Sequence, residues 1–162
     1  MSTINFYFID NSKWDFVMWF DSVVTANDIG IKNVADMVRK ILAKCSSGDK
    51  IGELRIFGHG NRDGQWIGGD WVTSASVSSH TIDFARLRPL FDPFGMITLG
   101  GCQVGLNDLL LAKLSAIVGV PVRAFTAKQR PGVPGDEGAE TKCYYLSCTH
   151  GKPVGFDHMD NE

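Results

Sequence analysis

The chain has 162 residues, of which 44% are hydrophobic and 21% charged, as in an ordinary soluble globular domain. Its net charge of −2, without a block of Lys or Arg, argues against a nucleic-acid partner, because nucleic-acid-binding proteins usually carry a basic patch. No apolar run approaches the roughly 20 residues that cross a membrane, so we expect no membrane partner either.

The length predicts one domain over residues 1–162, with 152–162 as a frayed tail. The segment Met1–Asp10 lacks the basic region and the small-residue cleavage site of a secretory signal. We therefore expect a cytoplasmic protein with reduced cysteines, or one exported without an N-terminal signal peptide. The sequence leaves the oligomeric state open.

Alternating apolar residues predict two N-terminal strands, at 4–10 and 14–20, which a polar turn joins into an antiparallel hairpin. An amphipathic stripe over 31–42 then predicts a helix that packs on a core. Asn27 or Asp28 is expected to cap the start of this helix.

The middle of the chain contains two apolar runs separated by a polar, glycine-rich segment. The runs Ile51–Phe57 and Met96–Leu99 predict buried strands. Between them we expect a short hairpin around Gly68 and Gly69 and a short helix from Asp83 to Leu90.

The third part begins with a helix over 106–118, which Asn107 or Asp108 opens and Gly119 closes. Two further strands are expected at 120–126 and 141–148, with a loop at 128–140 between them. Strands that alternate with helices predict a mostly parallel sheet with helices on both faces, which is a three-layer α/β/α sandwich.

His59 and Cys102 each follow one of the two central strands. Ligands bind beyond the carboxyl ends of parallel strands, and neighbouring strands lie about 4.8 Å apart, so the two side chains are expected at one edge. A neighbouring imidazole and a following helix N-terminus both favour the thiolate. We further expect the amides of Gly60 and Cys102 to form an oxyanion hole.

The segments LRIFGHG and MITLGGC give a His-Gly and a Gly-Cys pair after two apolar runs, with His59 and Cys102 separated by 43 positions. This pattern resembles the caspase-like cysteine peptidases, which include caspases, metacaspases, gingipains, separase and self-processing domains of bacterial toxins. The resemblance implies His59 as general base and acid, Cys102 as nucleophile and Gly60 as oxyanion donor. It also implies a three-layer fold and no metal or organic cofactor. The chain has Gly-Cys where caspases have Ala-Cys.

The loops 61–74 and 127–140 resemble the substrate-binding rims of that family. Asp63 or Asp70 would favour a basic residue in the substrate, and Arg123 or Arg130 an acidic one. The sequence does not decide between these charges.

Other residues allow two interpretations. Trp66 and Trp71 could stack on a peptide or sugar, although such residues more often anchor a loop to the core. His59 could simply bond a backbone carbonyl, and Cys102 could be a small buried hydrophobe. A zinc set of Cys143, Cys148, His150 and His158 fits no usual ligand spacing.

These observations favour a cysteine endopeptidase that cleaves a protein or peptide partner, or itself. Two alternatives stay open. One is a non-catalytic module that keeps the fold and binds a partner through residues 61–74. The other is a cysteine-dependent amidase or acyl transferase that acts on a non-protein substrate.

Overall fold

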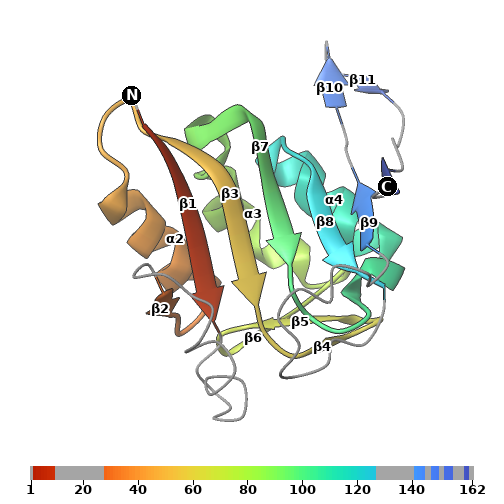
Figure 1. The fold of residues 1–162 in the computed structure, drawn as a ribbon. Coiled ribbons are helices and arrows are strands. Elements are labelled where there is room, and N and C mark those ends of the chain that lie inside the picture. The colour runs from red at the N-terminus through yellow and green to blue at the C-terminus, as the bar shows by residue number, and fades with distance from the viewer. Residues whose placement is uncertain are drawn as a thin grey trace.

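The computed structural model describes residues 2–9, 28–126, 141–144, 147–149, 152–154 and 159–160. Its centre is a seven-stranded sheet in the order β12-β9-β8-β7-β3-β1-β2 (Figure 1). The strands are β1 (Thr3–Ile9), β2 (Asp28–Gly30), β3 (Lys50–Phe57), β7 (Phe91–Leu99), β8 (Val122–Phe125), β9 (Thr141–Tyr144) and β12 (Met159–Asp160). The pairs from β2 to β8 are parallel, whereas β8–β9 and β9–β12 are antiparallel. The predicted α/β class with a mostly parallel sheet is therefore confirmed.

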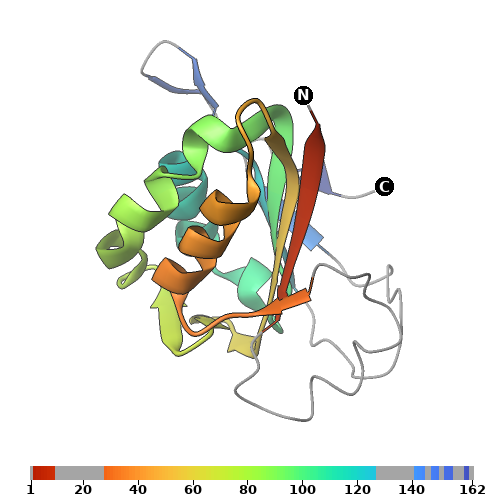
Figure 2. The same ribbon diagram turned by 90° about the vertical axis from the view of Figure 1, so that its left-hand side faces the viewer.

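The three helices within the described residues lie on one face of this sheet (Figure 2). They are α2 (Val34–Lys44), α3 (Thr81–Ala85) and α4 (Asp108–Val118). The crossovers from β2 to β3, from β3 to β7 and from β7 to β8 all proceed across the sheet in the same direction. Right-handed crossovers in one direction put every helix on the same side. The expectation of helices on both faces is thus not met in the part of the chain that the structure describes.

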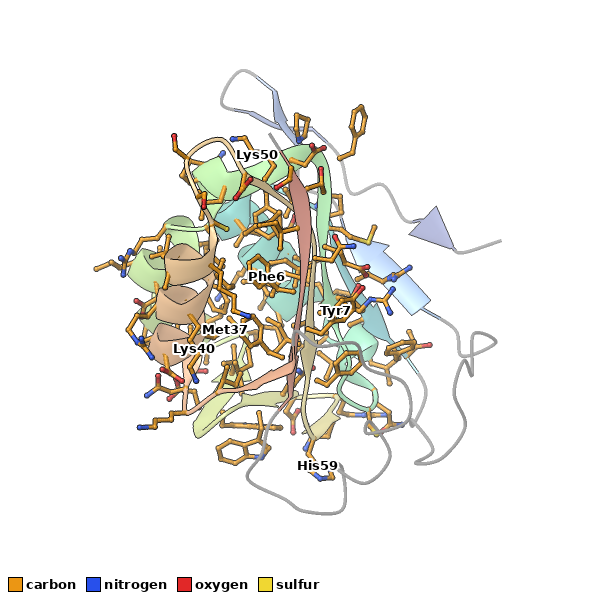
Figure 3. The ribbon with its side chains drawn as sticks, turned by 60° about the vertical axis from the view of Figure 1, so that its left-hand side comes forward. Phe6, Tyr7, Met37, Lys40, Lys50 and His59 are labelled. Atoms are coloured by element: carbon orange, nitrogen blue, oxygen red, sulfur yellow. The ribbon has the colours of Figure 1, made fainter. Side chains whose placement is uncertain are left out.

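The core lies between the sheet and these helices. Phe6 of β1 points toward Met37 of α2, while its neighbour Tyr7 points to the opposite side of the sheet, away from these helices (Figure 3). The same alternation buries Leu54 and Ile56 of β3. Period-two alternation in the strands and a helical stripe in α2 therefore meet in one apolar layer.

The start of α2 differs from the prediction. Asn33 caps this helix, because its Oδ1 accepts a hydrogen bond from the Asp36 N–H at 2.8 Å. Asp28, by contrast, begins strand β2, so the proposed caps at Asn27 and Asp28 are wrong for the described helix.

A second, three-stranded antiparallel sheet lies across the carboxyl ends of the parallel strands (Figure 1). It consists of β4 (Gly60–Asn61), β5 (Gly64–Ile67) and β6 (Asp70–Thr73). The expected hairpin at Gly68 and Gly69 joins β5 to β6, and Gly68 adopts a φ of +58° there. The extra strand β4 follows His59 directly, so this small sheet is built into the candidate site.

The helix after Cys102 begins and ends as predicted. Asn107 Oδ1 accepts from the Leu110 N–H at 3.0 Å, and Gly119 closes α4 with a φ of +74°. Leu106, which was expected in this helix, belongs to a preceding 3₁₀ turn, Val104–Leu106.

The remaining predicted elements agree with the structure only in part. The short helix expected from Asp83 to Leu90 is split into α3 and a 3₁₀ turn, Arg88–Leu90. The expected strand at 141–148 is split into β9 and β10 (Ser147–Thr149), which pairs with β11 (Lys152–Val154). Strands β11 and β12 lie in the segment expected to be a tail. Residues 14–20 and 127–140, with the second hairpin strand and Arg130, lie outside the described residues.

Candidate active site

The ends of β3 and β7 bring the two candidate catalytic residues to one edge. Ile56 of β3 pairs with Leu99 of β7, and the Gly100 N–H donates to the Ile56 carbonyl at 2.8 Å. His59 follows Ile56 by three residues, and Cys102 follows Leu99 by three. Both side chains therefore lie just beyond the C-terminal ends of the parallel strands, and Figure 3 shows His59 beyond the end of β3.

The backbones beside the two residues are in contact. A methyl group placed on Gly60 would lie 3.1 Å from Gly101 Cα and 2.6 Å from Val104 Cγ2. His59 immediately precedes Gly60, and Cys102 immediately follows Gly101, so the two side chains are carried by touching segments of chain. His59 is exposed and Cys102 is partly exposed, which leaves both open to solvent.

The small sheet holds the His59 side of the site. The Trp66 N–H of β5 donates to the His59 carbonyl at 2.9 Å, and Gly60 pairs with Gln65. Hydrogen-bonded and non-hydrogen-bonded pairs alternate along an antiparallel ladder, so the Gly60 N–H points away from β5. The ladder with β5 therefore does not use the Gly60 N–H.

Gln65 is a site residue that the sequence does not reveal. Its side chain is buried, donates from Nε2 to the Ile56 carbonyl at 2.8 Å, and accepts at Oε1 from the Gly101 N–H at 2.8 Å. Both partners are backbone atoms distant in sequence, which composition and periodicity do not show. The only local signal is a polar residue at a buried position of a predicted strand.

Asp63 lies at the rim of the site. It is exposed in the turn between β4 and β5, where its N–H donates to Asn61 Oδ1 at 2.7 Å. Its carbonyl accepts from Asn107 Nδ2 at 2.9 Å, which ties this turn to the start of α4. Because Asn107 is five residues beyond Cys102, the turn flanks the thiol-bearing segment.

Trp66 and Trp71 pair across β5 and β6, with ring centroids 5.2 Å apart and the rings tilted by 48°. Both indoles are partly buried. Each ring therefore covers part of the other, and each keeps part of its own surface exposed.

Asp70 contacts the start of helix α2. Its Oδ2 accepts from the Val34 N–H at 3.0 Å and lies 4.0 Å from His80 Nδ1. A carboxylate at a helix N-terminus satisfies a backbone donor and interacts favourably with the helix dipole. Through the hydrogen bond to Val34, Asp70 joins β6 to the start of α2.

Arg123 lies in β8 on the face of the sheet opposite α2, α3 and α4. Its Nη2 is 3.5 Å from Glu53 Oε1 and 3.4 Å from Thr98 Oγ1. Glu53 Oε1 also accepts from Arg55 Nε at 2.7 Å and from Thr98 Oγ1 at 3.1 Å. The side chain of Arg123 is 23% exposed, so this network of three strands accounts for its charge within the sheet.

A comparison with protein families matches residues 8–132 to a domain of unknown function, DUF4347. The chain belongs to the DUF4347 family. No curated protein and no solved structure matches it. The DUF4347 match includes His59, Cys102, Gln65 and every rim residue described above, so the whole candidate site lies inside the family domain.

Several findings on the described residues of this DUF4347 domain concern metal ligands, thiols and membrane spans. Among residues 2–9 and 28–126, no group of three or more His, Cys, Asp or Glu side chains could hold a metal ion. Cys45, the other described cysteine with a defined side chain, lies just after α2, where burial and then the Asp49 charge raise the pKa of its thiol. The side chains of Cys143 and Cys148 and both histidines of the proposed zinc set lie outside the described residues. No helix in the described part is long and apolar enough to cross a membrane.

Proposed function

We propose that this chain is a caspase-like cysteine peptidase in which His59 and Cys102 form the catalytic dyad. The observation that supports it is the contact between Gly60 and Gly101 at the carboxyl edge of adjacent parallel strands. The contact joins the His-Gly and Gly-Cys motifs, which carry an exposed imidazole and a partly exposed thiol. An imidazole beside a thiol is the usual arrangement for activating a sulfur nucleophile.

The reaction proceeds in two halves. His59 takes the proton of the Cys102 thiol, and the sulfur attacks the scissile carbonyl carbon to form a tetrahedral intermediate. The intermediate collapses as the imidazolium gives its proton to the leaving amine, which leaves a thioester on Cys102. Water, deprotonated by His59, then hydrolyses the thioester, releases the carboxylic acid and restores the thiol.

The amides of Gly60 and Cys102 are proposed to stabilise the oxyanion of both tetrahedral intermediates. The Gly60 N–H points away from β5, so the ladder leaves it for this use. Gly60 has no side chain to keep a substrate from its amide. Donors of this kind lower the barrier most when they are fixed in place before the reaction.

Substrate recognition is assigned to the turn between β4 and β5 and to the neighbouring indole of Trp66. Asp63 presents an exposed carboxylate there, and the Asn107 bond fixes its backbone beside the thiol-bearing segment. This arrangement favours a substrate with a basic side chain near the cleaved bond. Asp70 and Arg123 have partners within the fold, so we propose structural roles for them.

The test compares thiol reactivity within one molecule. Cys102 should react with iodoacetamide faster than Cys45, whose thiol pKa is raised, and the difference should shrink in His59→Ala. Peptide mapping by mass spectrometry measures both rates in the same sample. Equal rates for the two cysteines, unchanged by His59→Ala, would refute the dyad and favour a non-catalytic binding module.

The substrate is then sought with a peptide library. The wild-type chain should cleave it, and Cys102→Ala should not. Cleavage of small non-peptide amides or esters without cleavage of any peptide would support an amidase or acyl transferase instead.

A further inference from the structure

Gln65 is the buried amide at the junction of the two sheets. Its exposed fraction is 1%, and Gly64 and Trp66 flank it on β5. Burying an amide without hydrogen-bond partners is costly, so a buried glutamine is retained only where its partners are fixed. Both ends of this side chain have such a partner, at Ile56 and Gly101.

The two hydrogen bonds complete the end of the parallel ladder. The Ile56 carbonyl accepts from the Gly100 N–H and from Gln65 Nε2, each at 2.8 Å, which uses both of its lone pairs. The next N–H along the chain, that of Gly101, donates a hydrogen bond to Gln65 Oε1. The turn that leads to Cys102 is thus held by a side chain from another sheet.

Strand β5 therefore fixes both halves of the dyad. The Trp66 N–H holds the His59 carbonyl, and the adjacent Gln65 side chain holds the Gly101 amide. We infer that Gln65 is a positioning residue, whose amide sets the distance and orientation of the Cys102 thiol relative to the His59 imidazole. This inference rests on the proposed function, because it concerns the same dyad.

Glutamine is the residue type that meets both demands. The site needs one donor for Ile56 and one acceptor for Gly101 at the end of a side chain of this length. Leucine offers neither group. An ionised glutamate keeps the acceptor but turns a second oxygen toward the Ile56 carbonyl, whereas a protonated glutamate restores the donor.

This chemistry gives a reversible test. Burial raises the pKa of a carboxyl group, so Gln65→Glu should pass from the ionised to the neutral form within the accessible pH range. We measure the alkylation rate of Cys102 in wild type, Gln65→Glu and Gln65→Leu from about pH 5 to 8, and divide each variant rate by the wild-type rate at the same pH. That ratio removes the part of the thiol and imidazole titrations that the variant shares with wild type.

The expected ratio for Gln65→Leu is below one at every pH. An ordinary thiol, with a pKa of about 8.5, is about a quarter ionised at pH 8, so the loss there is at most about fourfold, and it grows as the pH falls. The ratio for Gln65→Glu should be similarly low at about pH 8 and should recover toward one at about pH 5. The rate at Cys45, measured in the same samples, should match wild type throughout. Far-UV circular dichroism reports whether each variant is folded.

Three outcomes overturn the inference or the proposal beneath it. Ratios near one for both variants at all pH values, with wild-type Cys102 still dependent on His59, would refute the role of Gln65 alone. A ratio for Gln65→Glu that stays low at acid pH would also refute it. Wild-type Cys102 reactivity that His59→Ala leaves unchanged would refute the dyad itself. If Gln65→Leu does not fold, the pH dependence of Gln65→Glu decides the question.

Discussion

The closest approach between the two strand ends can be probed with one methyl group. Gly60→Ala would add a Cβ at 2.6 Å from Val104 Cγ2, 3.0 Å from the Gly64 carbonyl oxygen and 3.1 Å from Gly101 Cα. Two of these three neighbours are backbone atoms, and Val104 is fully buried. None of them can move aside without a shift of the segment that carries it.

The required movement can be estimated from ordinary contact distances. Carbon atoms attract best at about 3.5–4.0 Å, so the Val104 methyl would have to retreat by roughly 0.9 Å and the Gly101 backbone by roughly 0.4 Å. Overpacking of this kind costs about 1–3 kcal/mol of unfolding free energy. The same movement displaces His59 relative to Cys102. An ordinary thiol, with a pKa of about 8.5, is only about 3% ionised at pH 7, so a thiol that loses activation by the imidazole can lose up to roughly thirtyfold in alkylation rate at that pH.

Urea unfolding measures the first effect, and iodoacetamide labelling of Cys102 measures the second. Gly69→Ala is the matched control, because this glycine is an exposed turn residue of the same small sheet and its nearest neighbour, the Lys32 carbonyl oxygen, is 3.3 Å away. We expect it to change stability by no more than about 0.5 kcal/mol. If Gly60→Ala were as stable and as reactive as Gly69→Ala, the contact would not position the dyad.

Three further predictions concern charged side chains that hold the fold together. Asp70→Ala should lower the unfolding free energy by about 0.5–2 kcal/mol in urea, through loss of the acceptor at the start of α2, and leave the alkylation rate of the Cys102 thiol unchanged. Hydrogen bonds from Lys40 and Arg39 hold the pKa of Asp36 below its ordinary value of 3.8. Its stabilising contribution is therefore present at neutral pH and lost as the pH falls below about 4, so Asp36→Asn should lose less stability than wild type between about pH 5 and pH 3 in urea unfolding. Glu53→Gln should cost about 1–3 kcal/mol, and a double-mutant cycle with Arg123→Met should show a coupling of at least about 0.5 kcal/mol.

The elements that the sequence predicts best are those with a complete local signal. Strand β3 is an apolar run of the expected length that stops at a glycine, and the observed bounds, Lys50–Phe57, differ from the prediction by one residue. Helix α4 combines a hydrophobic repeat with Asn107 before it and Gly119 after it. In both cases propensity, periodicity and end signals agree, so little depends on the rest of the chain.

The start of α2 and the arrangement of layers depend on information that is not local. Asn27, Asp28 and Asn33 are all acceptable cap residues, and the pairing of β2 with β1 excludes Asp28 by making it part of a strand. The described helices occupy one face because the connections from β2 to β3, from β3 to β7 and from β7 to β8 cross the sheet in one direction, and sequence periodicity does not encode that order.

The candidate site also contains some residues that local sequence signals place and others whose contacts depend on distant parts of the chain. His59 and Cys102 could be placed at one edge because each follows a recognisable buried strand. The partners of Asp70 and Arg123 could not be found, since Val34 is 36 positions from Asp70 and Glu53 is 70 positions from Arg123. The sequence therefore shows the charges of Asp70 and Arg123 but not their partners within the fold.

The glycines and the glutamine of the site depend on each other. A Cβ on Gly60 would lie 3.1 Å from Gly101 Cα, and one on Gly101 would lie 2.7 Å from Gln65 Oε1 and 2.8 Å from Val104 Cγ2. Gly101 is buried, and a buried donor left without an acceptor costs about 1–3 kcal/mol. Gln65 supplies the acceptor from the strand that already holds His59. The two features therefore act together. The glycines allow the His-Gly and Gly-Cys segments to come into contact, and Gln65 accepts the hydrogen bond that the buried Gly101 N–H cannot give to water.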